Sequence, residues 1–142
     1  MKVSQVGPAI IGVALLSCAT PTENELPAVE LLTDRTPYVV GDSAVLTLTN
    51  RSTNSIVVDW TCGEVIQQMV GTSWESLGGF PDEFCIMEDE WRVDPDASIE
   101  RQFQVAARAF PSTGEYRVQV PAADPGSRRS FVIWSNPFTV EN

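Results

Sequence analysis

From residue 28 onward, apolar and polar residues alternate in short runs that turn residues separate. In the clearest run, Ser43–Asn50, every second residue is apolar and would face a core: Ala44, Leu46 and Leu48. A period of two is that of a half-buried β-strand, and no segment of the chain shows a sustained helical stripe. The pattern therefore restricts the chain to an all-β fold, and many short strands at this spacing indicate a sandwich.

The runs and the turn residues between them predict nine extended regions. They are Ala28–Thr33, Thr36–Asp42, Ser43–Asn50, Ser55–Trp60, Glu64–Val70, Thr72–Leu77, Ser98–Ala106, Glu115–Val120 and Ser130–Val140, the last interrupted at Asn136 and Pro137. One residue breaks the alternation, because Arg101 falls on the same side as the inward Ile99, Phe103 and Val105. We expect Arg101 to lie near a sheet edge.

The segment Gly114–Val120 is the strongest fold marker. Tyr116, Val118 and Val120 share one face of the predicted strand, and the tyrosine follows a glycine turn. This arrangement suits a tyrosine corner, in which the ring packs in the core and the hydroxyl bonds to backbone a few residues upstream.

Six sequence segments occur in a characteristic order along residues 28–142. They are Tyr38–Asp42, Leu46–Ser52, Trp74, Asp94–Ser98, Gly114–Val118 and Ser135–Val140. Together they resemble the immunoglobulin-like domains of bacterial envelope proteins and lipoproteins. The resemblance implies an immunoglobulin-like antiparallel β-sandwich of about seven to nine strands, without shared catalytic residues. The chain departs from the family at Asp96, where glycine is frequent, and in its pair Cys62 and Cys85.

The first seventeen residues are typical of a short export signal, with Lys2 followed by the apolar run Val6–Leu16. The run is shorter than the roughly 20 residues that span a bilayer. Leu15-Leu16-Ser17-Cys18 resembles the lipobox of bacterial lipoproteins, which implies that Cys18 is lipidated and becomes the new N-terminus. Residues 18–27 are polar and proline-bearing, as expected of a flexible tether. The alternative is an ordinary secretory signal that is cut nearby.

The charge and the residue inventory exclude several functions. Lys2 is the only lysine, so residues 18–142 carry eight arginines against 19 acidic residues, which disfavours nucleic acid and anionic lipid head groups as partners. The chain has no histidine, the commonest general base and metal ligand. We therefore expect no enzyme activity, no cofactor and no metal centre.

The two remaining cysteines, Cys62 and Cys85, would lie in an oxidising compartment after export, where such a pair usually forms a disulfide. The bridge would stabilise the fold by roughly 3 kcal/mol on a chain-entropy argument. A two-cysteine metal site is the weaker alternative, since no histidine or second cysteine pair accompanies it.

The four tryptophans suggest a binding surface. Trp60 is expected to lie in the core or over the disulfide. Trp74, Trp91 and Trp134 are predicted to line an exposed patch, and the alternative is that they pack in the core. The acidic residues between Asp82 and Asp96 would suit calcium, but they lack the spacing of a known calcium loop, and a solvated face is favoured.

These observations predict a non-enzymatic lipid-anchored protein of the bacterial cell envelope. It would lie at the outer membrane or the cell surface, and a location on the periplasmic side is an alternative. It would attach to the membrane through Cys18 and bind an envelope protein or a polysaccharide. Two alternatives remain. The chain could inhibit a proteinase through the loop Gly78–Glu83, because a bacterial inhibitor family has a similar short sandwich, or it could be a carbohydrate- or calcium-binding module.

Overall fold

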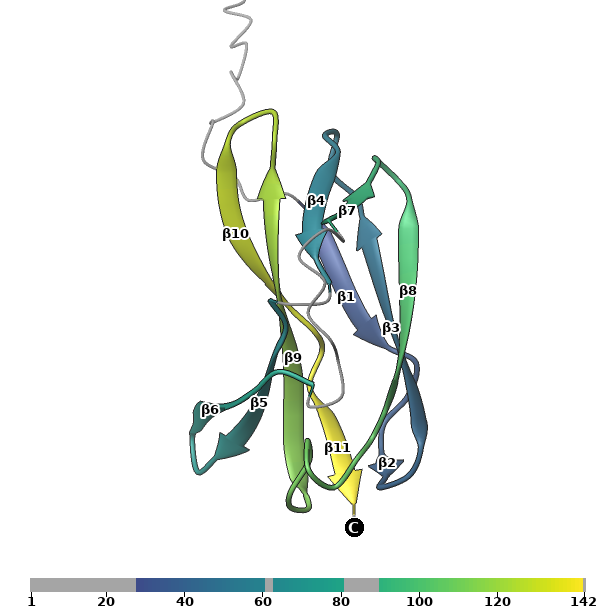
Figure 1. Cartoon of the computed structure of the whole chain (residues 1–142), viewed down its shortest axis with the longest axis vertical. Coiled ribbons are helices and arrows are strands. Elements are labelled where there is room, and N and C mark those ends of the chain that lie inside the picture. Colours follow the sequence, from purple (N-terminus) through teal and green to yellow (C-terminus); the bar gives the residue numbers. More distant parts are fainter. Residues whose placement is uncertain (1–27, 61–62, 81–89, 142) are drawn as a thin grey trace, which may run out of the picture.

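The structure, a computed structural model, describes residues 28–60, 63–80 and 90–141. These residues form eleven strands in two facing sheets, an all-β immunoglobulin-like sandwich (Figure 1). The strands are β1 Val29–Thr33, β2 Tyr38–Val39, β3 Ser43–Asn50, β4 Ile56–Asp59, β5 Val65–Val70, β6 Ser73–Gly78, β7 Glu90–Val93, β8 Ser98–Gln104, β9 Gly114–Asp124, β10 Arg129–Trp134 and β11 Phe138–Glu141.

The smaller sheet has the order β1-β3-β8 and is antiparallel. Its central strand β3 confirms the predicted alternation, because Ala44, Leu46 and Leu48 are fully buried while the residues between them are partly exposed. Burying one face of a strand in this way fixes its register, since a slip of one residue would turn the apolar side chains outward.

The larger sheet is built around the eleven-residue strand β9. On one side, β9 pairs with β11 through its first residues and with β10 through its last. On the other side, it pairs with β5 and then with β4. Strands β2, β6 and β7 extend this sheet beyond β11, β5 and β4 respectively.

The structure differs from the sequence prediction in the number of strands and in one strand pairing. Strand β7, which begins at Glu90, was not predicted, and the expected region Ser130–Val140 forms two strands, so the described residues hold eleven strands instead of about seven to nine. The sandwich also contains one parallel pair, β2 with β11. After β1 the chain crosses to the other sheet through the cis peptide bond Thr36–Pro37, and it then runs beside β11 in the same direction.

The core between the sheets is apolar and rich in aromatic rings. Phe110 lies at its centre, edge-on to Tyr116 with ring centroids 5.1 Å apart and in contact with Phe138 at 6.0 Å. The predicted tyrosine corner is confirmed, because the buried Tyr116 donates its hydroxyl to the backbone carbonyl of Ser112 at 2.5 Å.

A buried ion pair connects the two sheets. Arg101 lies in β8, the edge strand of the smaller sheet, as its break in the alternation predicted. Its guanidinium reaches inward, contacts the carboxylate of Glu64 just before β5, and donates to the carbonyl of Trp60. The Glu64 side chain is 2% exposed and that of Arg101 11%. Burial lowers the pKa of Arg101 to about 10, so the guanidinium stays charged at neutral pH.

Candidate functional site

The outer face of the larger sheet carries the most distinctive surface of the described residues. Along β9 the side chains of Tyr116, Val118 and Val120 point into the core. The residues that alternate with them therefore point away from it, among them Arg117, Gln119, Pro121 and Ala123. No described strand packs over this outward row, since the only second layer of the sandwich, the sheet β1-β3-β8, faces the opposite side.

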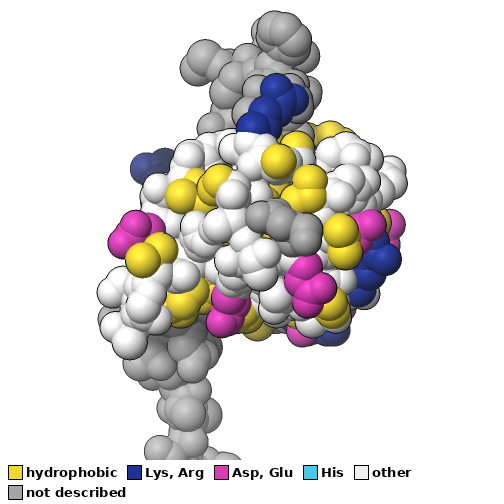
Figure 2. All heavy atoms as spheres, turned by 90° about the horizontal axis from the view of Figure 1, so that it is seen from below, with side chains coloured by type: hydrophobic (Ala, Val, Ile, Leu, Met, Phe, Trp, Pro, Cys, Tyr) yellow, Lys and Arg dark blue, Asp and Glu magenta, His cyan; other side chains and the backbone are white. Residues whose placement is uncertain are grey.

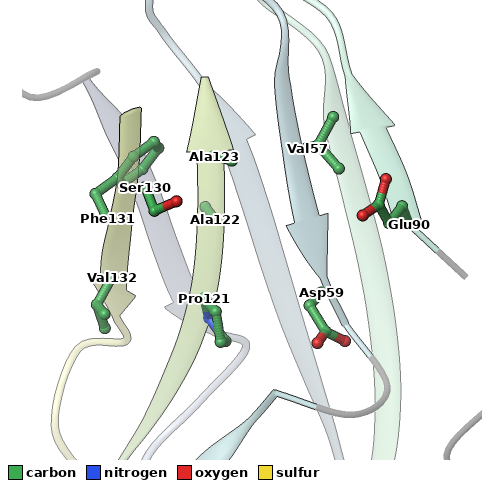
Figure 3. A pocket seen from close by; sticks show the side chains of 9 residues that line it. All are labelled: Val57, Asp59, Glu90, Pro121, Ala122, Ala123, Ser130, Phe131 and Val132. Carbon is green, nitrogen blue, oxygen red and sulfur yellow. The ribbon is translucent and has the colours of Figure 1, made fainter. Parts of the chain in front are cut away.

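A shallow groove of about 390 Å³ crosses the end of this face formed by β7, β4, β9 and β10 (Figure 3). Apolar side chains make its floor and one wall, with Pro121 and Ala123 on β9 and Val132 on β10. Phe131 contributes from the core side, since it pairs with the buried Ala122. The complete lining is Val57, Asp59, Glu90, Pro121, Ala122, Ala123, Ser130, Phe131 and Val132.

The opposite wall of the groove is acidic. Asp59 on β4 and Glu90 on β7 are direct partners in the antiparallel register, and Figure 3 shows both carboxylates on this side of the groove. Side chains directly opposite one another on neighbouring antiparallel strands have Cβ atoms about 5 Å apart, so these two acidic side chains are neighbours. The groove thus combines an apolar floor with one negatively charged wall.

Close packing beside the groove explains one glycine. A Cβ atom on Gly63 would lie 2.5 Å from the Cγ of Pro121 and 2.9 Å from the Oδ2 of Asp59. Real Cβ atoms do not approach other atoms so closely, so only glycine fits here. The backbone at Gly63 therefore packs directly against the groove residues Asp59 and Pro121.

Next to the groove, an arginine lies between two tryptophans on the same outer face. The Arg117 guanidinium is 4.4 Å from the ring centroid of Trp74 on β6 and 5.4 Å from that of Trp134 on β10. Its Nε donates to the Oε1 of Gln67 at 2.7 Å, and the Nε2 of Gln67 donates to Gln119 at 3.2 Å. Partial burial lowers the pKa of Arg117. Stacking of this kind holds the guanidinium in one orientation.

The two tryptophans predicted to share a binding surface lie on different faces of the sheet. Both are about half exposed, Trp91 at 46% and Trp134 at 48%. Trp134 pairs with the outward Gln119, whereas Trp91 pairs with the buried Val58 and so points to the core side. There Trp91 lines a separate hollow with Trp60, which is buried as predicted, and with Arg101. The true neighbours of Trp134, Arg117 and Trp74, follow from strand pairing that sequence alternation alone does not reveal.

The end of the molecule that carries the C-terminus offers a weaker surface. Figure 2 shows hydrophobic side chains scattered there among mostly uncharged surface, with charged side chains between them. They do not gather into a continuous patch, unlike the apolar side chains that line the groove.

Several predicted sites lie outside the described residues. These are the lipidation site Cys18, both members of the expected disulfide, Cys62 and Cys85, and most of the acidic stretch considered for calcium. Of the predicted inhibitory loop Gly78–Glu83, the structure describes only the beginning, where Phe80 packs against Phe103 with ring centroids 4.8 Å apart.

Within the described ranges, no three side chains of histidine, cysteine, aspartate or glutamate come together as a metal site would require. The same residues contain no helix whose length and apolar character would suffice to cross a membrane.

Comparison with known proteins gives no family. No family model matches the chain, and no curated protein matches it. Among solved structures, the structural genomics target SoR45 is 13% identical with a TM-score of 0.49, over 80% of this chain and 85% of that chain. The PapD-like domain 7 of human CEP192 is 11% identical with a TM-score of 0.42, over 94% and 97%. The alkylpurine DNA glycosylase AlkC of Pseudomonas fluorescens is 13% identical with a TM-score of 0.43, over 83% of this chain and 32% of that chain.

Proposed function

We propose that this protein is a non-enzymatic binding module of the bacterial cell envelope, anchored by lipid at Cys18, and that it binds a partner with the outer face of its larger sheet. The observation that carries the proposal is this face, over which no described strand packs, with an apolar groove of about 390 Å³ near the exposed Trp134. Concave apolar surfaces with a few charged groups at their rim are typical of recognition sites.

The anchor rests on the sequence, where the apolar run Val6–Leu16 leads into the tetrad that ends at Cys18. A binding role without catalysis is supported by the residue inventory. The sequence lacks histidine, and its only lysine is Lys2, so the usual general bases other than carboxylates are missing from the part that would remain after processing.

The geometry of the chain also supports an anchored arrangement. Val29, at the start of β1, pairs with Asn50 beside the turn Asn50–Asn54. The chain therefore enters the sandwich at the end opposite to the C-terminus (Figure 1). A tether from Cys18 to residue 28 reaches at most about 35 Å when extended, so it would hold this end near the membrane and leave the groove accessible on the side.

Membrane attachment is tested by fractionation of the producing cells. The wild-type protein should partition with membranes, and Cys18→Ala should appear in the soluble fraction, whereas the matched variant Thr20→Ala should behave like the wild type. Equal membrane attachment of the Cys18 variant would contradict the anchor.

The binding face is tested by cross-linking in intact cells. A charged residue in the groove, Val132→Glu, should abolish cross-linked adducts of the wild-type protein. Thr47→Glu, on the partly exposed outer face of the smaller sheet, is the matched control and should keep them. Adducts that survive Val132→Glu unchanged would contradict the proposed face.

A further inference from the structure

Arg117 is held in place on the outer face of the larger sheet without a carboxylate partner among the described residues. Its guanidinium contacts the rings of Trp74 and Trp134 and donates through Nε to the amide oxygen of Gln67. Each of four other described arginines forms an ion pair with a carboxylate of the chain; they are Arg35, Arg51, Arg92 and Arg101. In a chain with 19 acidic residues against nine basic ones, this absence of a counter-ion at an ordered guanidinium is notable.

The contacts of Arg117 leave its terminal nitrogens available. Trp74 and Trp134 come from β6 and β10, which lie on opposite sides of β9, and Gln67 occupies Nε. The two terminal nitrogens donate no hydrogen bond to any residue of the described ranges, and the side chain is partly exposed. A planar guanidinium can present two parallel N–H groups to the two oxygens of one carboxylate.

We propose that Arg117 binds the carboxylate of an aspartate or glutamate side chain of a partner protein, and that apolar residues of the same segment lie in the neighbouring groove. The proposal deepens the function proposed above and rests on it.

The arginine and the groove belong to one continuous surface. On β9, Arg117, Gln119 and Pro121 are successive outward residues, and Pro121 lines the groove. On β10, the direct partners of the last two are Trp134 and Val132, and Val132 also lines the groove. An extended segment advances about 6–7 Å over two residues. A carboxylate at Arg117 would therefore be followed, two to four residues away, by a side chain over the groove.

Charge complementarity at this point favours a carboxylate. Burial lowers the pKa of Arg117, and no neighbouring carboxylate counters this effect by raising it. The guanidinium nevertheless stays charged at neutral pH, so a bound carboxylate would supply its counter-ion. The ring contacts and the bond to Gln67 order the side chain before binding, which reduces the conformational entropy that binding would cost.

The charge of the whole chain restricts the kind of partner. A net charge of −10 repels a polyanion at long range, which disfavours a polymer of acidic sugars. A protein segment with one acidic residue among apolar ones carries little charge and can use both the arginine and the apolar groove.

The test uses the mature protein purified from membranes in detergent, labelled for NMR, in a buffer free of carboxylates and phosphate. The probes are three blocked pentapeptides with leucine at both ends, serine beside each leucine, and glutamate, glutamine or lysine in the middle. The glutamate peptide should shift the Nε–H signal of Arg117 and the methyl signals of Val132 with saturation. The glutamine peptide should bind about fivefold more weakly, the upper end for a solvent-accessible ion pair, and the lysine peptide should not shift the Arg117 signal.

Charge variants assign the site. Gln67→Glu keeps an acceptor for the Nε of Arg117 but supplies an internal carboxylate, which should compete with the glutamate peptide and weaken its binding about fivefold. Arg117→Gln should weaken binding at least as much. Arg128→Gln, which removes one exposed positive charge between β9 and β10, is the matched control and should leave the affinity unchanged. The spectrum of each variant without peptide reports whether it is folded.

Four results would overturn the proposal. They are equal affinities for the glutamate and glutamine peptides, no shift of the Arg117 signal at millimolar glutamate peptide, full affinity in Gln67→Glu, and tighter binding of trigalacturonic acid than of the glutamate peptide, which would assign the site to an acidic polysaccharide.

These outcomes are distinct from a failure of the proposed function. The peptide measurements depend neither on lipidation nor on cross-linking in cells. If the glutamate peptide fails to bind while Val132→Glu still abolishes cross-linked adducts, the binding face stands and only the carboxylate ligand is rejected.

Discussion

Arg101 of the smaller sheet and Glu64 of the larger sheet form an ion pair inside the sandwich, with the Glu64 side chain almost completely buried. Removing one member leaves an uncompensated buried charge, which costs about 3–5 kcal/mol. We expect Arg101→Met alone to lower the free energy of unfolding by this amount, as measured by urea denaturation.

The double variant Arg101→Met/Glu64→Leu distinguishes a charge effect from lost packing. Replacing a whole buried ion pair by apolar residues is often neutral, so the double variant should regain most of the stability that the single variant loses. A double variant that is less stable than the single one would show that packing around Phe80, which the Arg101 guanidinium covers at 5.5 Å, dominates instead.

The tyrosine corner gives a second prediction. Tyr116→Phe keeps the ring contacts with Phe110 but leaves the carbonyl of Ser112 without the hydroxyl donor 2.5 Å away. Loss of a buried hydrogen bond of this kind costs about 1–3 kcal/mol. Chemical denaturation should show this decrease with an unchanged m-value, and a decrease well below 1 kcal/mol would mean that the corner is incidental to stability.

The third prediction concerns acid stability. Burial raises the pKa of the Asp34 carboxyl, but hydrogen bonds from the Val45 amide and the Tyr38 hydroxyl outweigh burial, and the net pKa lies below 3.8. A lowered pKa means that Asp34 stabilises the fold above about pH 4 and that this contribution is lost as the pH falls through the folded-state pKa.

The urea midpoint of the wild type should therefore fall more steeply between about pH 6 and pH 3 than that of Asp34→Asn, which cannot titrate at this position. Other carboxylates with lowered pKa, such as Asp124, contribute equally to both proteins and cancel in the comparison. Parallel declines in the two proteins would contradict the role assigned to Asp34.

The stack of Trp74, Arg117 and Trp134 yields a fourth prediction. Each cation–π contact at an exposed site contributes about 0.5–1 kcal/mol, so Arg117→Gln should lower the free energy of unfolding by about 1–2 kcal/mol and change the tryptophan fluorescence of the folded protein. Arg117→Lys keeps the positive charge but loses the bond from Nε to Gln67, and its loss should be intermediate. Unchanged fluorescence in Arg117→Gln would argue against the stack.

The sequence was sufficient to predict the fold class, the faces of the main strands and the tyrosine corner, because these depend on local alternation and on turn residues. Ser43–Asn50 is an example, since its inward residues are those expected from a period of two. Strand β7 escaped prediction because only four residues, from Glu90 to Val93, form it, and they read as part of an acidic loop.

The candidate site could be predicted only in part. Trp134 was predicted as a candidate for an exposed patch, but Trp134, Arg117 and Trp74 lie in three different strands, β10, β9 and β6, whose arrangement depends on strand pairing. The same holds for Asp59 and Glu90, which face each other only because β4 pairs with β7. Alternation assigns a side chain to a face, whereas the register between distant strands decides which side chains meet.

Strand β9 provides ladder partners to four other strands of the larger sheet, yet it lies near the C-terminal end of the chain. During synthesis, β4 and β5 emerge long before the strand against which both must assemble. Pairs among the preceding strands, such as the β5–β6 hairpin and the sheet β1-β3-β8, can form earlier, but the larger sheet cannot assemble without β9. This order of strands means that the two sheets can enclose the aromatic core only after β9, β10 and β11 have all been synthesised.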